Sequence, residues 1–191
     1  MSAFEDAELV EPPTLADWGS WLAAHHADRA GAWLVTAKKS TGRQAFDYDA
    51  AVVEALRFGW VDAVQRKLDD ERSMLWFAPR RPRSGWSRPN KLRIERLERE
   101  GRLEAAGRAA VEVAKGNGGW TLLDEVEDLV VPDDLADAFA ALPEARDNWD
   151  AFPPSARRGM LEWVVQARRA ETRERRVSEI AEKAARGIRA R

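Results

Sequence analysis

The sequence lacks cysteine and has only one tyrosine and two histidines among its 191 residues. Without cysteine there is no disulfide framework, no thiol nucleophile and no thiolate metal site. The two histidines, His25 and His26, are adjacent, so on a helix they would point about 100° apart and could not easily share a metal ion. We therefore predict no metal and no cofactor.

Long apolar runs are also missing. No stretch approaches the roughly 18–20 apolar residues that a membrane-spanning helix needs. The first thirteen residues are acidic and have no apolar core, so we do not expect a signal peptide. Together with the absence of cysteine, this composition leads us to expect a cytoplasmic protein.

The net charge of −2 excludes a global field that would attract nucleic acid or lipid. The charges are nevertheless unevenly distributed. Residues 124–137 carry seven acids and no base, whereas residues 80–96 carry seven bases and one acid. Local fields of this kind act within a Debye length of about 8–10 Å. The basic segment is therefore the first place to look for an anionic partner.

The pattern of apolar residues predicts an α+β fold with a small antiparallel sheet packed by helices, followed by a C-terminal helical region. We expect a flexible lead-in over 1–13 and an α+β domain over 14–120. A connector over 121–131 and a helical domain over 132–191 complete the chain. No fixed-period repeat is present.

Within the α+β domain, Thr14 and Asp17 have the spacing of a helix capping box. Short β-branched segments predict strands over 32–39, 60–67 and 73–78, with the last two forming a hairpin. Each strand is bounded by turn-forming residues.

Further helices are expected from Ser87 to about residue 100 and from 103 to 115, the second ending at Gly116. Gly59 is placed to end the helix before the hairpin in a left-handed conformation. The last sixty residues read as four helices, with breaks at Pro143, at Pro153 and near Thr172.

The candidate site is the loop that joins the hairpin to the next helix. Its arginines could bind phosphate or carboxylate oxygens through two hydrogen bonds each, and the helix that follows offers free amides at its start. Lysines after the first strand could reach the same rim. The predicted ligand-binding residues are Lys38, Lys39, Trp60, Asp62, Arg80, Arg81, Ser84, Trp86, Ser87 and Asn90.

Other interpretations of these residues remain open. The loop arginines could pair with the acids of the hairpin turn, Asp69, Asp70 and Glu71, and the tryptophans could fill the core. Alternatively, tryptophans and arginines could bind single-stranded nucleic acid by stacking and phosphate contacts. Asp62 could act as a general base, although no second acid, serine or histidine lies at a spacing that would indicate a catalytic pair. We predict no catalytic residue.

Several short motifs are shared with a known family. They include E-A-L-x-F-G-W-V-D at 54–62, F-x-P-R-R-P-x-S-x-W-S at 77–87, S-A-R-R at 155–158 and A-R-R-A-E-T-R-E-R-R at 167–176. In this order, over about residues 14–188, the chain resembles the bacterial YdeI/OmpD-associated family. Arg57 and Ala63 depart from the residues usual in that family.

The resemblance implies a role in bacteriocin protection, tolerance of antimicrobial peptides and the response to envelope stress. It implies no particular reaction. We therefore expect a non-enzymatic cytoplasmic stress-protection protein that binds an anionic small molecule or an acidic protein partner. The alternatives are an enzyme that uses Asp62 with the arginine loop, and a nucleic-acid-binding regulator.

Overall fold

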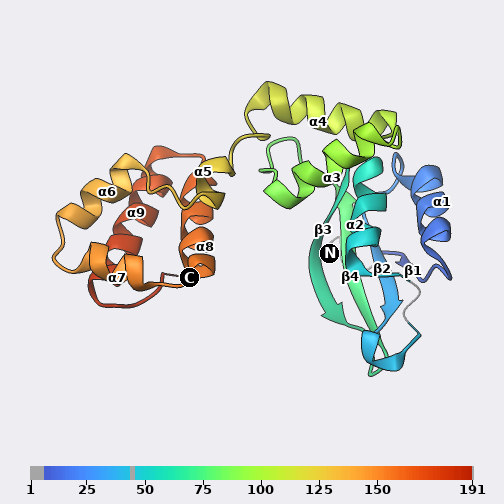
Figure 1. Cartoon of the computed structure of the whole chain (residues 1–191), viewed down its shortest axis with the longest axis horizontal. Coiled ribbons are helices and arrows are strands. Elements are labelled where there is room, and N and C mark those ends of the chain that lie inside the picture. The colour runs from blue at the N-terminus through green and yellow to red at the C-terminus, as the bar shows by residue number, and fades with distance from the viewer. Residues whose placement is uncertain (1–6, 44–45, 191) are drawn as a thin grey trace. The chain divides into compact units, whose positions relative to one another are not determined.

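The computed structural model describes residues 7–43 and 46–190 and divides the chain into two compact units. The first unit contains residues up to Ser84 together with Pro89–Gly119. The second contains Gly85–Arg88 and Trp120–Arg191. Figure 1 shows the strands in the first of these units and only helices in the second.

The sheet of the first unit has four strands, in the order β1-β2-β4-β3. Their bounds are Leu9–Val10 (β1), Ala32–Ala37 (β2), Trp60–Lys67 (β3) and Arg72–Pro79 (β4). As predicted, β3 and β4 form an antiparallel hairpin, and β2 pairs antiparallel with β4. The sheet is nevertheless mixed, because β1 pairs parallel with β2.

Strand β1 corrects the expectation of a flexible lead-in over 1–13. Val10 lies opposite Leu34 in the sheet and is 8% exposed, so this part of the segment is held by backbone pairing and by burial of an apolar side chain. Residues 1–6 of the lead-in lie outside the described residues.

Helices α1 (Leu15–His25) and α2 (Tyr48–Arg57) pack on each other and on the sheet. The predicted capping box is present, since the side chains of Thr14 and Asp17 each accept from the other's backbone amide. Trp18 connects the layers, because its indole donates to the carbonyl of Ala51 at 3.2 Å and its ring lies 5.3 Å from that of Phe77.

Helices α3 (Arg88–Arg99) and α4 (Ala105–Asn117) follow the hairpin. The predicted end of α4 at Gly116 is wrong, because the left-handed residue that ends it is Gly118, at φ 81°. Gly107 is needed for a close approach of the chain. A Cβ at this position would lie 2.3 Å from the carbonyl oxygen of Arg57.

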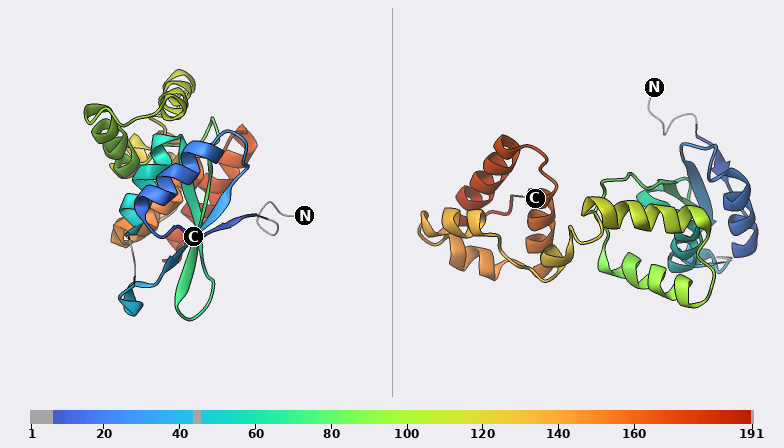
Figure 2. Two further views of the ribbon diagram at one scale, coloured as in Figure 1. Left: turned by 90° about the vertical axis from the view of Figure 1, so that its right-hand side faces the viewer. Right: turned by 90° about the horizontal axis from the view of Figure 1, so that it is seen from above.

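The turn end of the β3–β4 hairpin extends beyond helices α1 and α2 (Figures 1 and 2). The last five residues of β3 are accordingly exposed, whereas Trp60 at its start is buried. A break in register between Asp62 and Gln65 marks the place where β3 leaves the packed part of the sheet. The two ends of the hairpin thus have different surroundings.

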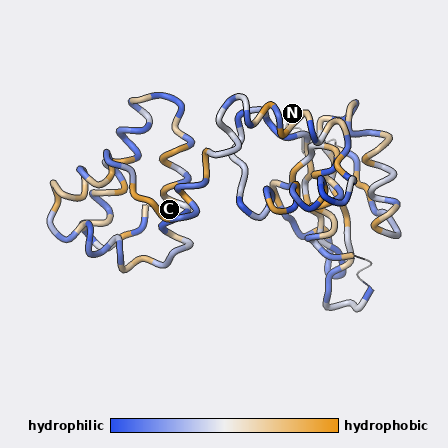
Figure 3. Tube along the Cα trace, turned by 45° about the horizontal axis from the view of Figure 1, so that its top comes forward, coloured by the Kyte–Doolittle hydropathy of each residue, from blue (hydrophilic) through white to orange (hydrophobic). Residues whose placement is uncertain are grey.

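The second unit is helical, as predicted. After the short helix α5 (Asp124–Glu127) come four helices, α6 (Asp133–Ala140), α7 (Ala145–Ala151), α8 (Pro154–Val165) and α9 (Ala170–Ala185). Hydrophobic stretches recur along these helices between hydrophilic ones (Figure 3). The largest side chains of their shared core belong to Leu135, Phe139, Trp149, Met160 and Ile180.

The segment 121–131, expected to be a connector, contributes to this core. Leu123 and Val126 are 5% and 2% exposed and belong to the same cluster as the four longer helices. Burial of two apolar side chains favours a fixed path over a loose link.

Candidate functional site

The five residues Arg80–Ser84, here called the arginine turn, form a fixed turn after β4. The amide and the hydroxyl of Ser84 both donate to the carbonyl of Arg81, at 3.0 and 2.8 Å. Pro82 suits the second position of such a turn because its φ is already fixed near −65°. The side chain of Asn117 donates to the carbonyl of Pro82 at 2.6 Å, so the turn is also tied to the end of α4.

Arg81 and Arg83 project from this turn and are exposed. Most arginines of the first unit have an acidic or aromatic partner, among them Arg57 with Glu54 and Arg66 over the ring of Trp33. Within the described part of that unit, the arginines with no side-chain ion pair, hydrogen bond or ring contact are Arg81, Arg83 and Arg99. Two of these three lie two residues apart in the arginine turn.

Arg80 differs from its neighbours because it is half-buried beside Asp62. Burial lowers the pKa of its guanidinium to about 10, and the charge of Asp62 acts in the opposite direction. Asp62 accepts a hydrogen bond of 2.7 Å from the hydroxyl of Tyr48. Burial and the Asp62 carboxylate raise the pKa of Tyr48 to about 12. The fold thus brings two predicted site residues, Asp62 and Arg80, together and adds Tyr48, which we had not singled out.

The side chain of Asn90 is part of a hydrogen-bonded network with Arg93 and Asp49. Its side-chain oxygen accepts from Arg93 at 2.6 Å, and Arg93 also pairs with Asp49 at 2.5 Å. Asn90 is only 9% exposed, so it holds Arg93 in place and offers little surface to a ligand.

The predicted rim shared by Lys38, Lys39 and the loop arginines is wrong. Ala37 pairs with Arg72 in the sheet, which places both lysines at the turn end of the hairpin. Arg80 follows the opposite end of β4, eight residues away, or about 26 Å at the rise of an extended strand. The Lys38 ammonium instead donates to the carbonyls of Asp69 and Asp70 at 2.8 and 3.0 Å.

The alternative pairing of the loop arginines with the hairpin acids is wrong for the same reason. Asp69 binds Arg72, Asp70 binds Lys67 and Glu71 binds Arg43, at 2.5–2.7 Å. These three acids therefore form ion pairs with basic side chains at their own end of the sheet.

Neither Trp60 nor Trp86 presents a ring face to a ligand, since both are 1% exposed. The Trp60 indole donates to the carbonyl of His26 at 3.1 Å. Trp86 lies in the second unit with Ser87, and its ring is 5.1 Å from that of Trp120. The interpretation that the tryptophans fill the core is confirmed for most of them. Buried examples are Trp18, Trp33, Trp60, Trp76, Trp86 and Trp149.

The amide at the start of α3, predicted to be open to an anion, is already used. The backbone amide of Arg88 donates to both oxygens of Glu127, at 3.0 and 3.1 Å. Arg158 also donates to Glu127, at 2.8 Å, and the carboxylate is 8% exposed. The carboxylate of Glu127 thus occupies the position at the start of α3 where the sequence predicts an anionic ligand.

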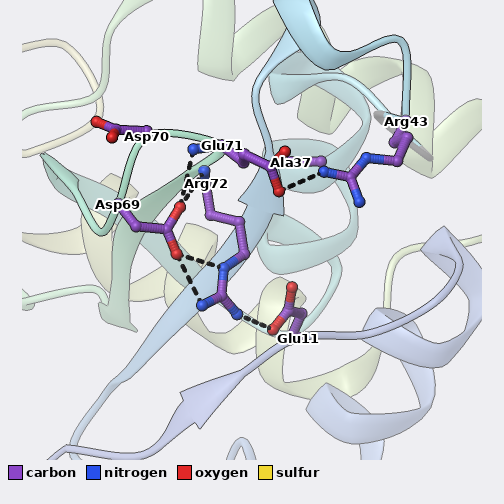
Figure 4. Close-up of a pocket in the computed structure, with 7 residues that line it drawn as sticks. All are labelled: Glu11, Ala37, Arg43, Asp69, Asp70, Glu71 and Arg72. Carbon is purple, nitrogen blue, oxygen red and sulfur yellow. Dashed lines mark hydrogen bonds and ion pairs between the residues drawn. The ribbon is translucent and has the colours of Figure 1, made fainter.

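An open pocket of about 660 Å³ lies at the turn end of the hairpin. Figure 4 shows Arg72 between Asp69 and Glu11, with Arg43 reaching toward Glu71. We had not assigned this pocket. The only sequence signal was the run of acids at 69–71, which pointed to ion pairing. The remaining lining residues are Ala37 and Asp70.

Most of the charges that line the pocket are paired with one another, whereas Asp70 pairs with Lys67, which does not line it. Hydrogen bonds donated by Arg72 lower the pKa of Asp69, and the hydrogen bonds that Arg72 donates to Asp69 and Glu11 raise its own pKa. Over the described ranges, 7–43 and 46–190, no three histidine or acidic side chains gather in a way that could hold a metal. The pocket is therefore lined by exposed ion pairs, with four acids and two arginines.

The described helices include none that is long and apolar enough to cross a membrane. In this respect the structure agrees with the expectation from the sequence.

Two families match the chain. Residues 10–110, more than half of the sequence, match the domain of unknown function DUF8412. Residues 128–187 match the family described as "Bacteriocin-protection, YdeI or OmpD-Associated". No curated protein and no solved structure matches.

The resemblance to the YdeI/OmpD-associated family is thus confirmed over a shorter range than the 14–188 expected. The motifs at 54–62 and 77–87 fall in the segment that matches the other family. The chain belongs to the DUF8412 family, and its residues 128–187 are similar to the YdeI/OmpD-associated family.

Proposed function

We propose that this chain is a non-enzymatic binding protein that takes an anionic group at the arginine turn and acts in bacterial stress protection. The match of residues 128–187 to a bacteriocin-protection family supports the second half of this proposal. The cytoplasm is the proposed compartment, so protection would be indirect rather than by capture of a peptide outside the cell.

One observation carries the binding half. Arg81 and Arg83 are exposed and have no partner among the described residues, while the backbone that carries them is fixed by Ser84 and Asn117. A fixed backbone reduces the conformational entropy that is lost on binding. Guanidinium groups also suit carboxylate and phosphate oxygens better than other cations do.

A titration with pyrophosphate, followed by NMR of the arginine side-chain N–H groups, tests the binding. We expect the signals of Arg81 and Arg83 to shift with a common dissociation constant. The double variant Arg81→Ala/Arg83→Ala should abolish the response. Arg99→Ala is the matched control, because Arg99 is also exposed and unpaired among the described residues but lies at the end of α3. Unshifted Arg81 and Arg83 signals at 50 mM pyrophosphate would refute the proposal.

A protection assay separates binding from the enzymatic alternative. In bacteria that depend on this protein for survival of a bacteriocin, the double arginine variant should lose protection and Asp62→Asn should keep it. Loss of protection by Asp62→Asn, with pyrophosphate binding intact, would favour an enzyme that uses Asp62.

A further inference from the structure

We infer that the partner of the arginine turn is an extended acidic segment of a protein, with carboxylates at alternate positions, rather than a small anion or a nucleic acid. This inference rests on the proposed function and assigns the partner's chemistry.

Small anions are usually held by several backbone amides that converge on one point. Around the arginine turn, several amides are already used. The amide of Arg80 donates to Gly59, that of Ser84 to Arg81 and that of Arg88 to Glu127, and Pro82 has no amide hydrogen. Recognition at this turn is therefore carried chiefly by the guanidinium groups.

Two exposed guanidinium groups bind a single small anion weakly. An exposed ion pair improves binding by about five-fold at most, so two pairs together give a dissociation constant of roughly 40 mM or weaker. A segment with several carboxylates gains further contacts and a faster, electrostatically guided association. Useful affinity at this turn thus requires a partner with more than one anionic group.

The spacing of the two arginines favours an extended peptide. Arg81 and Arg83 are the first and third residues of the turn closed by Ser84, and two residues of chain span at most about 7 Å between Cα atoms. In an extended chain, side chains two residues apart point to the same side and are also about 7 Å apart. One carboxylate can therefore face each arginine without a change in either backbone.

The aromatic residues argue against a single-stranded nucleic acid. Proteins that bind single strands stack bases on exposed rings. Trp76 and Trp86, the tryptophans closest in sequence to the turn on either side of it, are 5% and 1% exposed. Phosphate contacts alone would remain.

The test compares three probes on the full chain by fluorescence anisotropy or NMR. They are an end-capped octapeptide of alternating glutamate and threonine, pyrophosphate, and an eight-nucleotide oligothymidylate. We expect the peptide to bind at least ten-fold more tightly than either of the others. The double variant Arg81→Ala/Arg83→Ala should weaken peptide binding at least ten-fold, and Arg99→Ala less than two-fold, with unchanged circular dichroism spectra for both variants.

The outcomes separate the two claims. If pyrophosphate or oligothymidylate binds as tightly as the peptide and depends on the same arginines, the inference is overturned while the proposed function stands. If no probe binds in an arginine-dependent way, both fail.

Discussion

The titration of Tyr48 gives a direct test of the network behind the arginine turn. Tyr48 is the sole tyrosine of the chain, so the phenolate absorbance near 295 nm reports a single group. Burial, the hydrogen bond to Asp62 and the negative charge of Asp62 raise the pKa of this phenol from 10.0 to about 12. We expect the folded protein to titrate at about 12 and the protein in guanidinium chloride at about 10.

The magnitude follows from the linkage between protonation and folding. A difference of two pKa units corresponds to about 2.7 kcal/mol between the two protonation states. The Tyr48 side chain is half exposed, so solvent screening reduces its effect on folding to about 1 kcal/mol. The folded state holds the proton more tightly. This contribution is therefore complete below pH 10 and is lost as the pH rises from about 10 to about 12.

Substitution of Asp62 identifies the cause. Asp62→Asn removes the negative charge and should lower the pKa of Tyr48 to a value between 10 and 12, because burial still acts. Asp49→Asn is the control, because the charge of Asp49 raises the pKa of Tyr48 less than Asp62 does, and it should change the titration less. A wild-type midpoint at 10, with native circular dichroism at that pH, would refute the proposed hydrogen bond.

Three further predictions concern folding stability, measured by urea denaturation. Glu54 is 5% exposed between Arg57 and Arg102, so Glu54→Gln should cost about 2–3 kcal/mol by removing the buried negative charge that both guanidinium groups share. By contrast, Glu104→Gln, at the more exposed Glu104–Arg57 pair, should cost at most about 1 kcal/mol. Equal losses would contradict this account. Gly107→Ala should destabilise by about 1–3 kcal/mol because its Cβ meets a carbonyl, while Gly116→Ala in the same helix, with nothing within 4 Å, should stabilise by about 0.5–1 kcal/mol. Finally, Thr14→Ala should cost about 1 kcal/mol through the lost cap of α1, and an unchanged stability would show that the cap contributes nothing.

Local chemistry made much of the fold predictable. The capping box at Thr14, the hairpin of β3 and β4, and the helices after residue 132 follow from turn residues and from the spacing of apolar side chains. The short strand β1 could not be predicted in this way. Its two residues gain their structure from pairing with β2, about twenty-four residues further along the chain, as the register of Leu9 with Trp33 shows.

The candidate site was predictable only in part. The cluster of arginines and its turn were visible in the sequence, because Pro82 and Ser84 favour a turn. The sequence did not show which lysines and arginines share a surface, because this depends on the direction of the strands that carry them. The register of β2 with β4 sends Lys38 to the far end of the sheet from Arg80. Likewise, nothing in the sequence near Ser87 indicated that Glu127, forty residues later, would take the amide of Arg88.

The short segment Gly85–Arg88 has a consequence for any attempt to divide the protein. It lies inside the stretch that matches DUF8412, yet it belongs to the compact unit that contains the YdeI/OmpD-associated match. A cut after Gly119 would separate Trp86 from Trp120 and would remove the hydrogen bond from Arg88 to Glu127. An expression fragment of residues 120–191 would therefore start with an uncovered indole and a buried acid that has lost one of its donors. The borders of the two sequence families are not the borders at which this chain can be cut.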